Sequence, residues 1–430
     1  MKNEELKNKN VLLKVILNSS FLIFTFLTAC SDFFEPVDSM PTPTEYSYNY
    51  WLLQRTYLFE DELPQLDENG DSVQELYSKL SDQFTRYVPP SKSEATITQI
   101  NTSLVPGDVG MKYYLYPQID HPIIISRVYP ESPAGRAGIP RYGNILNMNG
   151  IEIAGENATA KFDSVLNHSK DLSIKVAYLG DTTTYNITKE DVYAPTVFID
   201  TLNGTEVITI TSFKLNTVDK ENGTLGELTT YLNATRKTTA PRLIDLRNNP
   251  GGHVKHCTAM ADLFIEEGTL STRTWRGIAG NGTPTHNTVS EKAKRGDAGE
   301  GKKFMVLVNK NSASCAEIFA AALQEGAKIP IAGDTTYGKG IGQSNWKTLN
   351  GGLAVITNIE FLTPNGNSYH KRGIIPDYPC EDATLECGIT AMQKAFGTRA
   401  LAKQQNQVSE KTPIHEAPLW GGAFDDGEFQ

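Results

Sequence analysis

The sequence predicts a multidomain α+β protein with an α/β core, and three observations lead to this prediction. Short β-rich segments alternate with turn signals over 96–192, which indicates a small β-domain. Strand-like and helix-like segments alternate over 193–398, a pattern typical of an α/β core. Apolar residues at helical spacing over 46–95 predict a small N-terminal helical unit. With 430 residues, 39% of them apolar, the chain is long enough for two or three such domains.

Secondary structure can also be predicted for individual segments. Residues 46–87 are expected to be helical, and the Pro89-Pro90 pair ends this unit. A polar, Gly-rich surface loop is expected over 279–302. In the α/β core, strands are expected at 207–210, 243–246, 304–308 and 353–357, and helices at about 217–235, 253–266 and 314–326.

The N-terminus has the features of a secretory signal. A Lys-containing start precedes an apolar stretch from Val15 to Phe26, which is shorter than the roughly 20 residues of a membrane-spanning helix. The segment ends in Leu-Thr-Ala-Cys at Cys30, which resembles a bacterial lipobox. We therefore expect a signal peptide over 1–30, lipidation of Cys30 and attachment to a membrane of the cell envelope without spanning it. An ordinary signal peptide with an incidental cysteine, or an uncleaved anchor, is the alternative.

Charge and terminal composition limit the remaining possibilities. The net charge is −10 at pH 7 and the pI is near 5.3. Nucleic-acid-binding domains usually carry a basic stripe, so we expect no nucleic-acid partner. Residues 31–45, rich in Pro, Ser and acidic residues, predict a tether, and the polar residues 399–430 predict a disordered tail.

The other four cysteines, Cys257, Cys315, Cys380 and Cys387, are too few for a disulfide scaffold in a chain of this length. Cys380 and Cys387 are close enough in sequence to pair in an oxidising envelope, but the sequence leaves their pairing open. No Cys-x-x-Cys or His-x-x-x-His spacing occurs, so we expect neither a metal ion nor another cofactor.

The predicted β-domain contains Ser-Pro-Ala-x-x-Ala-Gly from Ser132, followed by a strand and an Asn-Gly turn. This arrangement resembles a PDZ domain, although Gly143-Asn144 replaces the usual Gly-Asp before the strand. The resemblance implies that a peptide C-terminus binds as an added strand beside Val109, Gly110 and Met111. A generic small β-domain is the alternative.

A predicted strand–turn–helix segment carries Ser314. The helix is apolar on nearly every side and should be buried. A serine at its start lies near free backbone N–H groups and the positive end of the helix dipole, which suits a nucleophile whose attack creates an oxyanion. Taken alone, Ser312 or Ser314 is more simply a helix N-cap.

Two further segments favour a chemical role. A helix of about 12 residues climbs roughly 18 Å, and a strand near 328–333 returns a similar distance. A Gly-Lys-Gly turn can therefore bring Lys339 beside Ser314, where burial would favour the uncharged amine that a base requires. A surface lysine or a phosphate-binding loop is the alternative, although Gly340 takes the place of the Ser or Thr that the latter needs.

The second segment runs from Asp245 to Gly252 and forms a Gly-rich turn after a strand. Such a turn exposes N–H groups that can bind an oxyanion. On its own it is equally a tight βα connection.

In combination, Ser-Ala-Ser-x-x-Glu-Ile, Gly-Lys-Gly and Asp-Leu-Arg-x-Asn-x-Gly-Gly resemble the carboxy-terminal processing peptidases, or tail-specific proteases. The resemblance implies an α/β core of the ClpP/crotonase-like type and a serine endopeptidase that cleaves unfolded or C-terminally tagged proteins. It implies the following roles: Ser314 as nucleophile, Lys339 as general base, Gln343 as the residue that orients the lysine, Glu317 and Thr336 as supporting residues, and the N–H groups of Gly251 or Gly252 and of Cys315 as the oxyanion hole.

Three alternatives to these roles remain open. Cys315 stands where the family more often has alanine, so it is either a small buried residue or a competing nucleophile. His253 and His256 follow the Gly-Gly turn and could contact substrate, although we do not expect them to be catalytic bases. A catalytically silent, peptide-binding lipoprotein on the same fold is the main alternative function.

Overall fold

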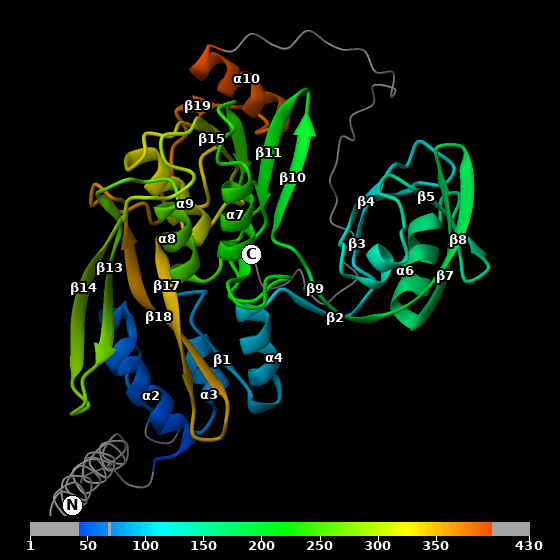
Figure 1. Cartoon of the computed structure of the whole chain (residues 1–430). Helices are drawn as coiled ribbons and strands as arrows, with labels where there is room; N and C mark the ends of the chain where they lie inside the picture. The colour runs from blue at the N-terminus through cyan, green and yellow to red at the C-terminus, as the bar shows by residue number, and fades with distance from the viewer. Residues whose placement is uncertain (1–42, 68–69, 398–430) are drawn as a thin grey trace, which may run out of the picture. The chain divides into compact units, whose positions relative to one another are not determined.

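The computed structural model describes residues 43–67 and 70–397 (Figure 1). The predicted signal peptide, the lipobox Cys30, nearly all of the tether and the C-terminal tail lie outside these residues. The chain forms two compact units. Unit 1 comprises Met1–Ser91, Trp275–Asn287 and Gln343–Ile359, and unit 2 comprises Lys92–Thr274, Thr288–Gly342 and Glu360–Gln430.

Unit 1 begins with helices α2 (Glu45–Thr56) and α3 (Val73–Ser78), separated by the short 3-10 helix η2 (Glu60–Glu62). Thr44 caps α2, since its hydroxyl accepts the backbone N–H of Ser47. The helical prediction for 46–87 holds only in part, because strand β1 (Arg86–Val88) follows α3 and pairs with β18 (Leu353–Leu362). The apolar faces of the two helices pack with Ala354 and Ile356 of β18.

A five-stranded sheet has the order β1-β18-β13-β14, and its fifth strand, β17 (Ile341–Lys347), also pairs with β18. Strand β13 (Thr269–Ile278) ends just before the surface loop predicted over 279–302, but β14 (Pro284–Lys292) lies within it, so that prediction is wrong over 284–292. The residues of β14 alternate between exposed and partly buried, and no side chain of this strand is buried. A strand of this kind lacks the apolar alternation by which strands are recognised.

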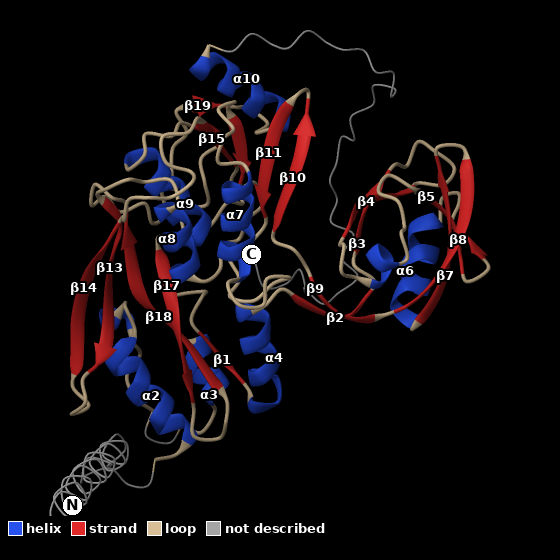
Figure 2. Cartoon of the chain, viewed as in Figure 1, coloured by secondary structure: helices blue, strands red, loops and turns tan. Residues whose placement is uncertain are grey.

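The β-domain predicted over 96–192, here called the PDZ-like region, contains one six-stranded sheet. Five strands follow the order β3-β4-β5-β7-β8, and β6 pairs with β5. Its core contains Ile125, Phe162 and Ile174, each with no exposed surface. Figure 2 shows α6 packed on this sheet. The bounds are β3 (Met111–Leu115), β4 (Ile123–Val128), α5 (Pro133–Arg136), β5 (Asn144–Met148), β6 (Ile151–Glu152), α6 (Ala158–His168), β7 (Asp171–Tyr178) and β8 (Asp181–Thr188). The predicted helix start, strand and Asn-Gly turn are confirmed at α5, β5 and the turn before β6.

Helix α4 (Pro90–Asn101) leads towards this region, and a two-stranded sheet of β2 (Leu104–Asp108) and β9 (Glu190–Tyr193) joins the two ends of its chain. The two connections run antiparallel through Leu104 and Tyr193. The PDZ-like region is therefore an insertion whose entry and exit strands pair with each other.

The α/β region contains a six-stranded sheet with the order β10-β11-β12-β15-β16-β19. Strands β10 and β11 are antiparallel, and every later pair is parallel. Every residue of β12 and β15 is buried, and those of β15 are all apolar, as expected for strands covered on both faces. The bounds are β10 (Val197–Leu202), β11 (Thr205–Ile210), β12 (Arg242–Asp245), β15 (Phe304–Val308), β16 (Ile331–Gly333) and β19 (Tyr378–Pro379).

Helices α7 (Gly223–Ala234), α8 (Val254–Asp262), α9 (Cys315–Glu325) and α10 (Leu385–Phe396) accompany this sheet (Figure 1). The three predicted helices are confirmed as α7, α8 and α9, each shorter than expected. Helix α10 packs Ile389 and Met392 against Leu243 and Leu307 of the sheet. No helix among residues 43–67 and 70–397 is long and apolar enough to cross a membrane.

Candidate active site

Three loops meet at the site because they follow three adjacent parallel strands. The turn with Gly251 and Gly252 follows β12, the segment with Ser314 follows β15, and the segment with Lys339 follows β16. The carboxyl ends of parallel strands lie at the same edge of a sheet, which is where open α/β sheets usually bind ligands. The order of the strands therefore brings together residues that are far apart in sequence.

Ser314 lies immediately before α9 and has a strained backbone. Its φ is 56° and its ψ is −116°, a conformation that non-glycine residues rarely adopt and that is frequent at functional sites. The side chain is partly exposed, although residues 315–323 of α9 are all buried. A buried helix thus holds a reachable hydroxyl at its N-terminus.

Ser312 has a different environment from Ser314. Its side chain is fully buried, and its hydroxyl donates to the carbonyl of Leu246 at 2.8 Å. The same hydroxyl accepts the backbone N–H of Asn309 at 3.0 Å. Ser312 therefore joins the loops after β12 and β15, and of the two serines only Ser314 is available for chemistry.

The carboxylate of Glu317 joins the serine segment to the lysine segment. Its Oε2 atom accepts the backbone N–H of Ser314 at 2.9 Å and that of Lys339 at 2.7 Å. Its Oε1 atom accepts the Thr336 hydroxyl and the Gly338 N–H, both at 2.6 Å. One fully buried side chain therefore fixes the backbone on both sides of the proposed dyad.

The environment of Glu317 has two opposing effects on its pKa. Burial raises the pKa, and the hydrogen bonds from Thr336, Gly338, Ser314 and Lys339 lower it, with burial the larger effect. All four partners are donors, so the ionised form fits the site best, because a protonated carboxyl would place its own O–H among them.

Close backbone contacts hold the lysine segment in place. The Thr336 hydroxyl, which donates to Glu317, also accepts the backbone N–H of Ile374 at 2.7 Å. A Cβ atom on Gly338 would lie 3.0 Å from the backbone nitrogen of Gly373. The late segment around Gly373 thus supports the loop of Lys339, whose side chain is partly buried.

Gly251 packs directly against the serine segment. A Cβ atom there would lie 2.8 Å from the Cβ atom of Ser314 and 2.8 Å from the backbone nitrogen of Cys315. Its φ of 100° also disfavours any side chain. Only glycine can occupy this position without moving Ser314.

Asn249 organises the turn that contains Gly251, a role that the sequence did not reveal. Its side chain donates to the carbonyl of Ile210 at 2.8 Å and accepts the N–H of Gly251 at 2.9 Å. Its own carbonyl accepts the N–H of Ala313 at 2.9 Å. Because Gly251 already donates to Asn249, the N–H of Gly252 is the donor of this turn that remains for an oxyanion.

Cys315 forms a disulfide with Cys257 of α8, with a Cα–Cα distance of 5.6 Å. Cys315 therefore has no free thiol, which removes the basis of the alternative in which it is the nucleophile. Cys380 and Cys387, whose pairing the sequence left open, form the second disulfide.

His253 and His256 lie at the start of α8, as expected, with their rings 6.2 Å apart. Burial lowers the pKa of both, that of His256 to about 4. Their Nδ1 atoms are buried and have no hydrogen-bond partner among the described residues. Among the described residues, no hydrogen bond or ring contact joins either histidine to Ser314.

Two groups of predicted residues belong to other parts of the fold. Gln343 belongs to unit 1, where its amide donates to the Thr357 hydroxyl at 2.9 Å, and its predicted action on Lys339 stays a prediction. In the PDZ-like region, Val109 is buried and Met111 begins β3. Gly110 has a φ of 77° and fits tightly against Ser132.

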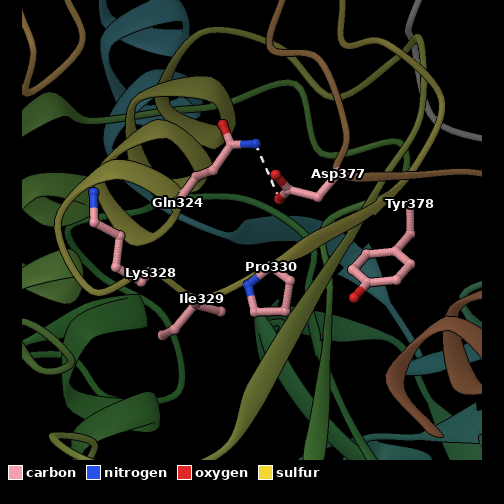
Figure 3. Close-up of a pocket in the computed structure, with 6 residues that line it drawn as sticks. All are labelled: Gln324, Lys328, Ile329, Pro330, Asp377 and Tyr378. Carbon is pink, nitrogen blue, oxygen red and sulfur yellow. Dashed lines mark hydrogen bonds between the residues drawn. The ribbon is translucent and has the colours of Figure 1, made fainter. Parts of the chain in front are cut away.

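Figure 3 shows a surface pocket at the far end of α9 from Ser314. Gln324 and Asp377 line it and are joined by a hydrogen bond of 3.1 Å. Ten residues of helix separate Ser314 from Gln324, which corresponds to about 15 Å. This pocket is therefore separate from the serine–lysine cluster.

Comparison with known proteins agrees with this arrangement. The sequence profile of peptidase family S41 matches residues 205–380. A carboxyl-terminal-processing protease of Picosynechococcus sp. is 28% identical over 338 residues, which cover 76% of this chain and 77% of that protein. The probable CtpA-like serine protease of Staphylococcus aureus is 27% identical over 330 residues, but the chain spans only 62% of its length.

A solved structure supports the same fold. An S41 protease from Bacteroides fragilis matches with a TM-score of 0.56 and 15% identity, over 84% of this chain and 100% of that one. The profile match covers all three loops of the site, from the Gly251 turn to Lys339. Over residues 205–380 the chain is therefore similar to peptidase family S41.

Proposed function

We propose that this protein is a serine endopeptidase in which Ser314 is the nucleophile and Lys339 the general base. The observation that carries the proposal is the single carboxylate of Glu317, which accepts the N–H groups of both residues. Gly251 packs against Ser314 from the neighbouring loop, so an amide-rich turn borders the nucleophile. These contacts support an acyl-transfer site built from three loops.

In the proposed mechanism, uncharged Lys339 takes the proton of the Ser314 hydroxyl as the oxygen attacks a peptide carbonyl. The N–H groups of Gly252 and Cys315 then stabilise the oxyanion of the tetrahedral intermediate. The leaving amine departs with a proton from the lysine, and water releases the acyl group by the same sequence of transfers. Gln343 orients Lys339 in this scheme.

We further propose that the substrates are unfolded or C-terminally tagged proteins. The PDZ-like fold supports this, because such domains add a peptide as an extra strand. Here β3 is an end strand of the sheet order, and Val109–Met111 lead into it. The lipobox-like ending at Cys30 supports a lipid-anchored protein of the cell envelope. An anchored peptidase of this kind would act on polypeptides in the envelope that have free C-terminal tails.

The test compares the full chain with its Ser314→Ala and Lys339→Ala variants on an unfolded protein that bears an apolar C-terminal tail. Both variants should lose at least about a thousandfold in kcat/KM. Lys328→Ala is the matched lysine control, because Lys328 is exposed at the far end of α9 and should leave turnover unchanged.

The same experiment decides between the alternatives. A serine-reactive phosphonate should label the peptide that contains Ser314 in the parent chain and not in Ser314→Ala. Undiminished cleavage by Ser314→Ala would refute the serine mechanism. A parent chain that binds tailed peptides but neither cleaves them nor reacts with the phosphonate would instead be the silent binding protein.

A further inference from the structure

The Cys257–Cys315 disulfide joins the two helices that follow the proposed oxyanion donors. Cys315 is the first residue of α9 and directly follows Ser314, whereas Cys257 lies in the second turn of α8. Helix α8 begins just after Gly252, with His253 as its N-cap. Both cysteines are fully buried, so the bond lies inside the packing between the helices.

The bond links two sides of the site. One side runs from Cys315 to Ser314, and the other runs from Cys257 back along α8 to Gly252. Between these sides the direct contacts are non-covalent: the N–H of Ala313 donates to Asn249 at 2.9 Å, and Gly251 packs on Ser314. The disulfide is the only covalent restraint on the spacing of the two loops in the described part of the chain, apart from the backbone itself.

We propose that Cys257 and Cys315 are positioning residues whose disulfide fixes the separation of the Gly252 and Cys315 N–H donors. The proposal rests on the serine-peptidase function above. Oxyanion stabilisation requires two donors aimed at one small atom, and a displacement of about 1 Å can cost about a hundredfold in rate. The thiol–disulfide state of this pair therefore sets the turnover number, whereas substrate affinity depends on other surfaces.

The chemistry of opening the bond is simple. A dithiol reductant attacks one sulfur atom, the S–S bond breaks, and the reductant leaves as its cyclic disulfide. Two electrons pass to the protein, and two protons complete the thiols of Cys257 and Cys315. An oxidising compartment outside the cytosol keeps the bond closed. The enzyme is then fully active only where such a bond persists.

The second disulfide is a matched control within the same chain. Cys380 follows β19 and Cys387 lies in α10, where both pack in the cluster that contains Leu243 and Leu307, and neither cysteine adjoins Ser314 or Lys339 in sequence. Cys387 is partly exposed, whereas Cys257 and Cys315 have no exposed surface. A dithiol should therefore open Cys380–Cys387 first and Cys257–Cys315 more slowly.

The experiment uses the purified full chain, Cys257→Ala/Cys315→Ala and Cys380→Ala/Cys387→Ala. The measurements are kcat and KM on a chromogenic peptide, the Kd of a peptide boronic acid that forms a tetrahedral adduct, and the unfolding temperature. We expect the first double variant to lose at least about tenfold in kcat and in boronate affinity, with KM within about threefold of the parent. The second should keep the parent kcat.

Reduction of the parent chain provides a reversible version of the test. Activity should fall in step with alkylation of the Cys257 and Cys315 peptides rather than with the earlier alkylation of Cys380 and Cys387, and reoxidation should restore it. The proposal is overturned if the folded Cys257→Ala/Cys315→Ala variant keeps its kcat. It is also overturned if variant and reduced parent lose activity only by unfolding, because the bond would then be purely structural. Failure of the peptidase assignment itself would instead appear as undiminished activity in Ser314→Ala.

Discussion

Ser314 and Lys339 donate their backbone N–H groups to the same atom, Oε2 of Glu317, at 2.9 and 2.7 Å. The two residues lie on loops that follow different strands, so this atom fixes the distance between the loops that carry the proposed dyad. Neither bond involves the reactive side chains. The carboxylate can therefore position the proposed nucleophile and the proposed base without hydrogen bonding to the hydroxyl or the amine that would exchange a proton.

Glu317→Gln should impair both catalysis and stability. The substitution replaces one carboxylate oxygen with an amide nitrogen, which cannot accept the hydrogen bonds that the oxygen accepted. Each buried donor left without an acceptor lowers the free energy of unfolding by about 1–3 kcal/mol. We expect kcat/KM to fall at least about tenfold and the urea midpoint to decrease. Glu325→Gln is the control on the same helix, because Glu325 accepts the N–H of Asn365 near the surface. Equal behaviour of the two variants would contradict the positioning role.

Gly251→Ala should abolish most activity without abolishing folding. The new methyl group would lie 2.8 Å from atoms of Ser314 and Cys315 and would push the serine segment away from the turn. Gly268→Ala separates this clash from backbone strain, because Gly268 has a similar φ of 110° but open space around it. Initial rates and unfolding temperatures should show loss of stability in both variants and a loss of about a hundredfold in kcat only in Gly251→Ala.

Gly110→Ala should weaken the binding of substrate proteins that carry long C-terminal tails. A Cβ atom at Gly110 would lie 2.0 Å from the Cβ atom of Ser132, so the loop before β3 must move. Gly107→Ala is the control, because Gly107 has a comparable φ of 61° and a Cβ atom there would have nothing within 4 Å. We expect a higher KM for a tailed protein in Gly110→Ala alone, with hydrolysis of a short peptide unchanged. Identical kinetics of the two variants on the tailed protein would exclude this loop from tail binding.

The stability of the fold should depend on pH through His256. Burial, followed by the charges of His253 and Lys255, lowers the pKa of His256 from 6.5 to about 4. At a pH between these two pKa values, His256 is protonated in the unfolded chain but not in the folded chain. The free energy of unfolding therefore falls as the pH falls from 6.5 towards 4. Above pH 6.5 this contribution is complete.

Urea unfolding at pH 7 and pH 5 measures this effect. The decrease between the two pH values should be smaller in His256→Gln than in the parent, whereas the exposed His286→Gln should retain the parent decrease. The partly buried His253 contributes in the same direction, because its pKa is also lowered, so the decrease should shrink without vanishing.

The loops of the site could be predicted from the sequence because their chemistry is local. Glycines beside Lys339 and at Gly251 indicate tight backbone approaches, and a serine before an apolar helix indicates an exposed hydroxyl on a buried support. The alternation of strands and helices then predicts that such loops collect at one edge of a sheet. Each inference needs only neighbouring residues and the usual geometry of α/β units.

Other features depend on distances that the sequence does not contain. Cys257 and Cys315 are 58 residues apart, and only the packing of α8 on α9 brings their Cα atoms to 5.6 Å. The role of Asn249 depends on its contact with Ile210, on a different strand. Strand β14 has no buried residue, so its sequence predicts a polar loop and not a strand.

The three-part construction of unit 1 has a practical consequence for truncation. Helices α2 and α3 pack on Ala354 and Ile356, which lie within the profile-matched peptidase region, and β1 pairs with Val355. A fragment restricted to residues 205–380 would expose this apolar surface and leave β18 with an unpaired edge, a combination that promotes aggregation. The residues before the PDZ-like insertion are thus an obligatory part of the folding unit, and expression trials should retain them.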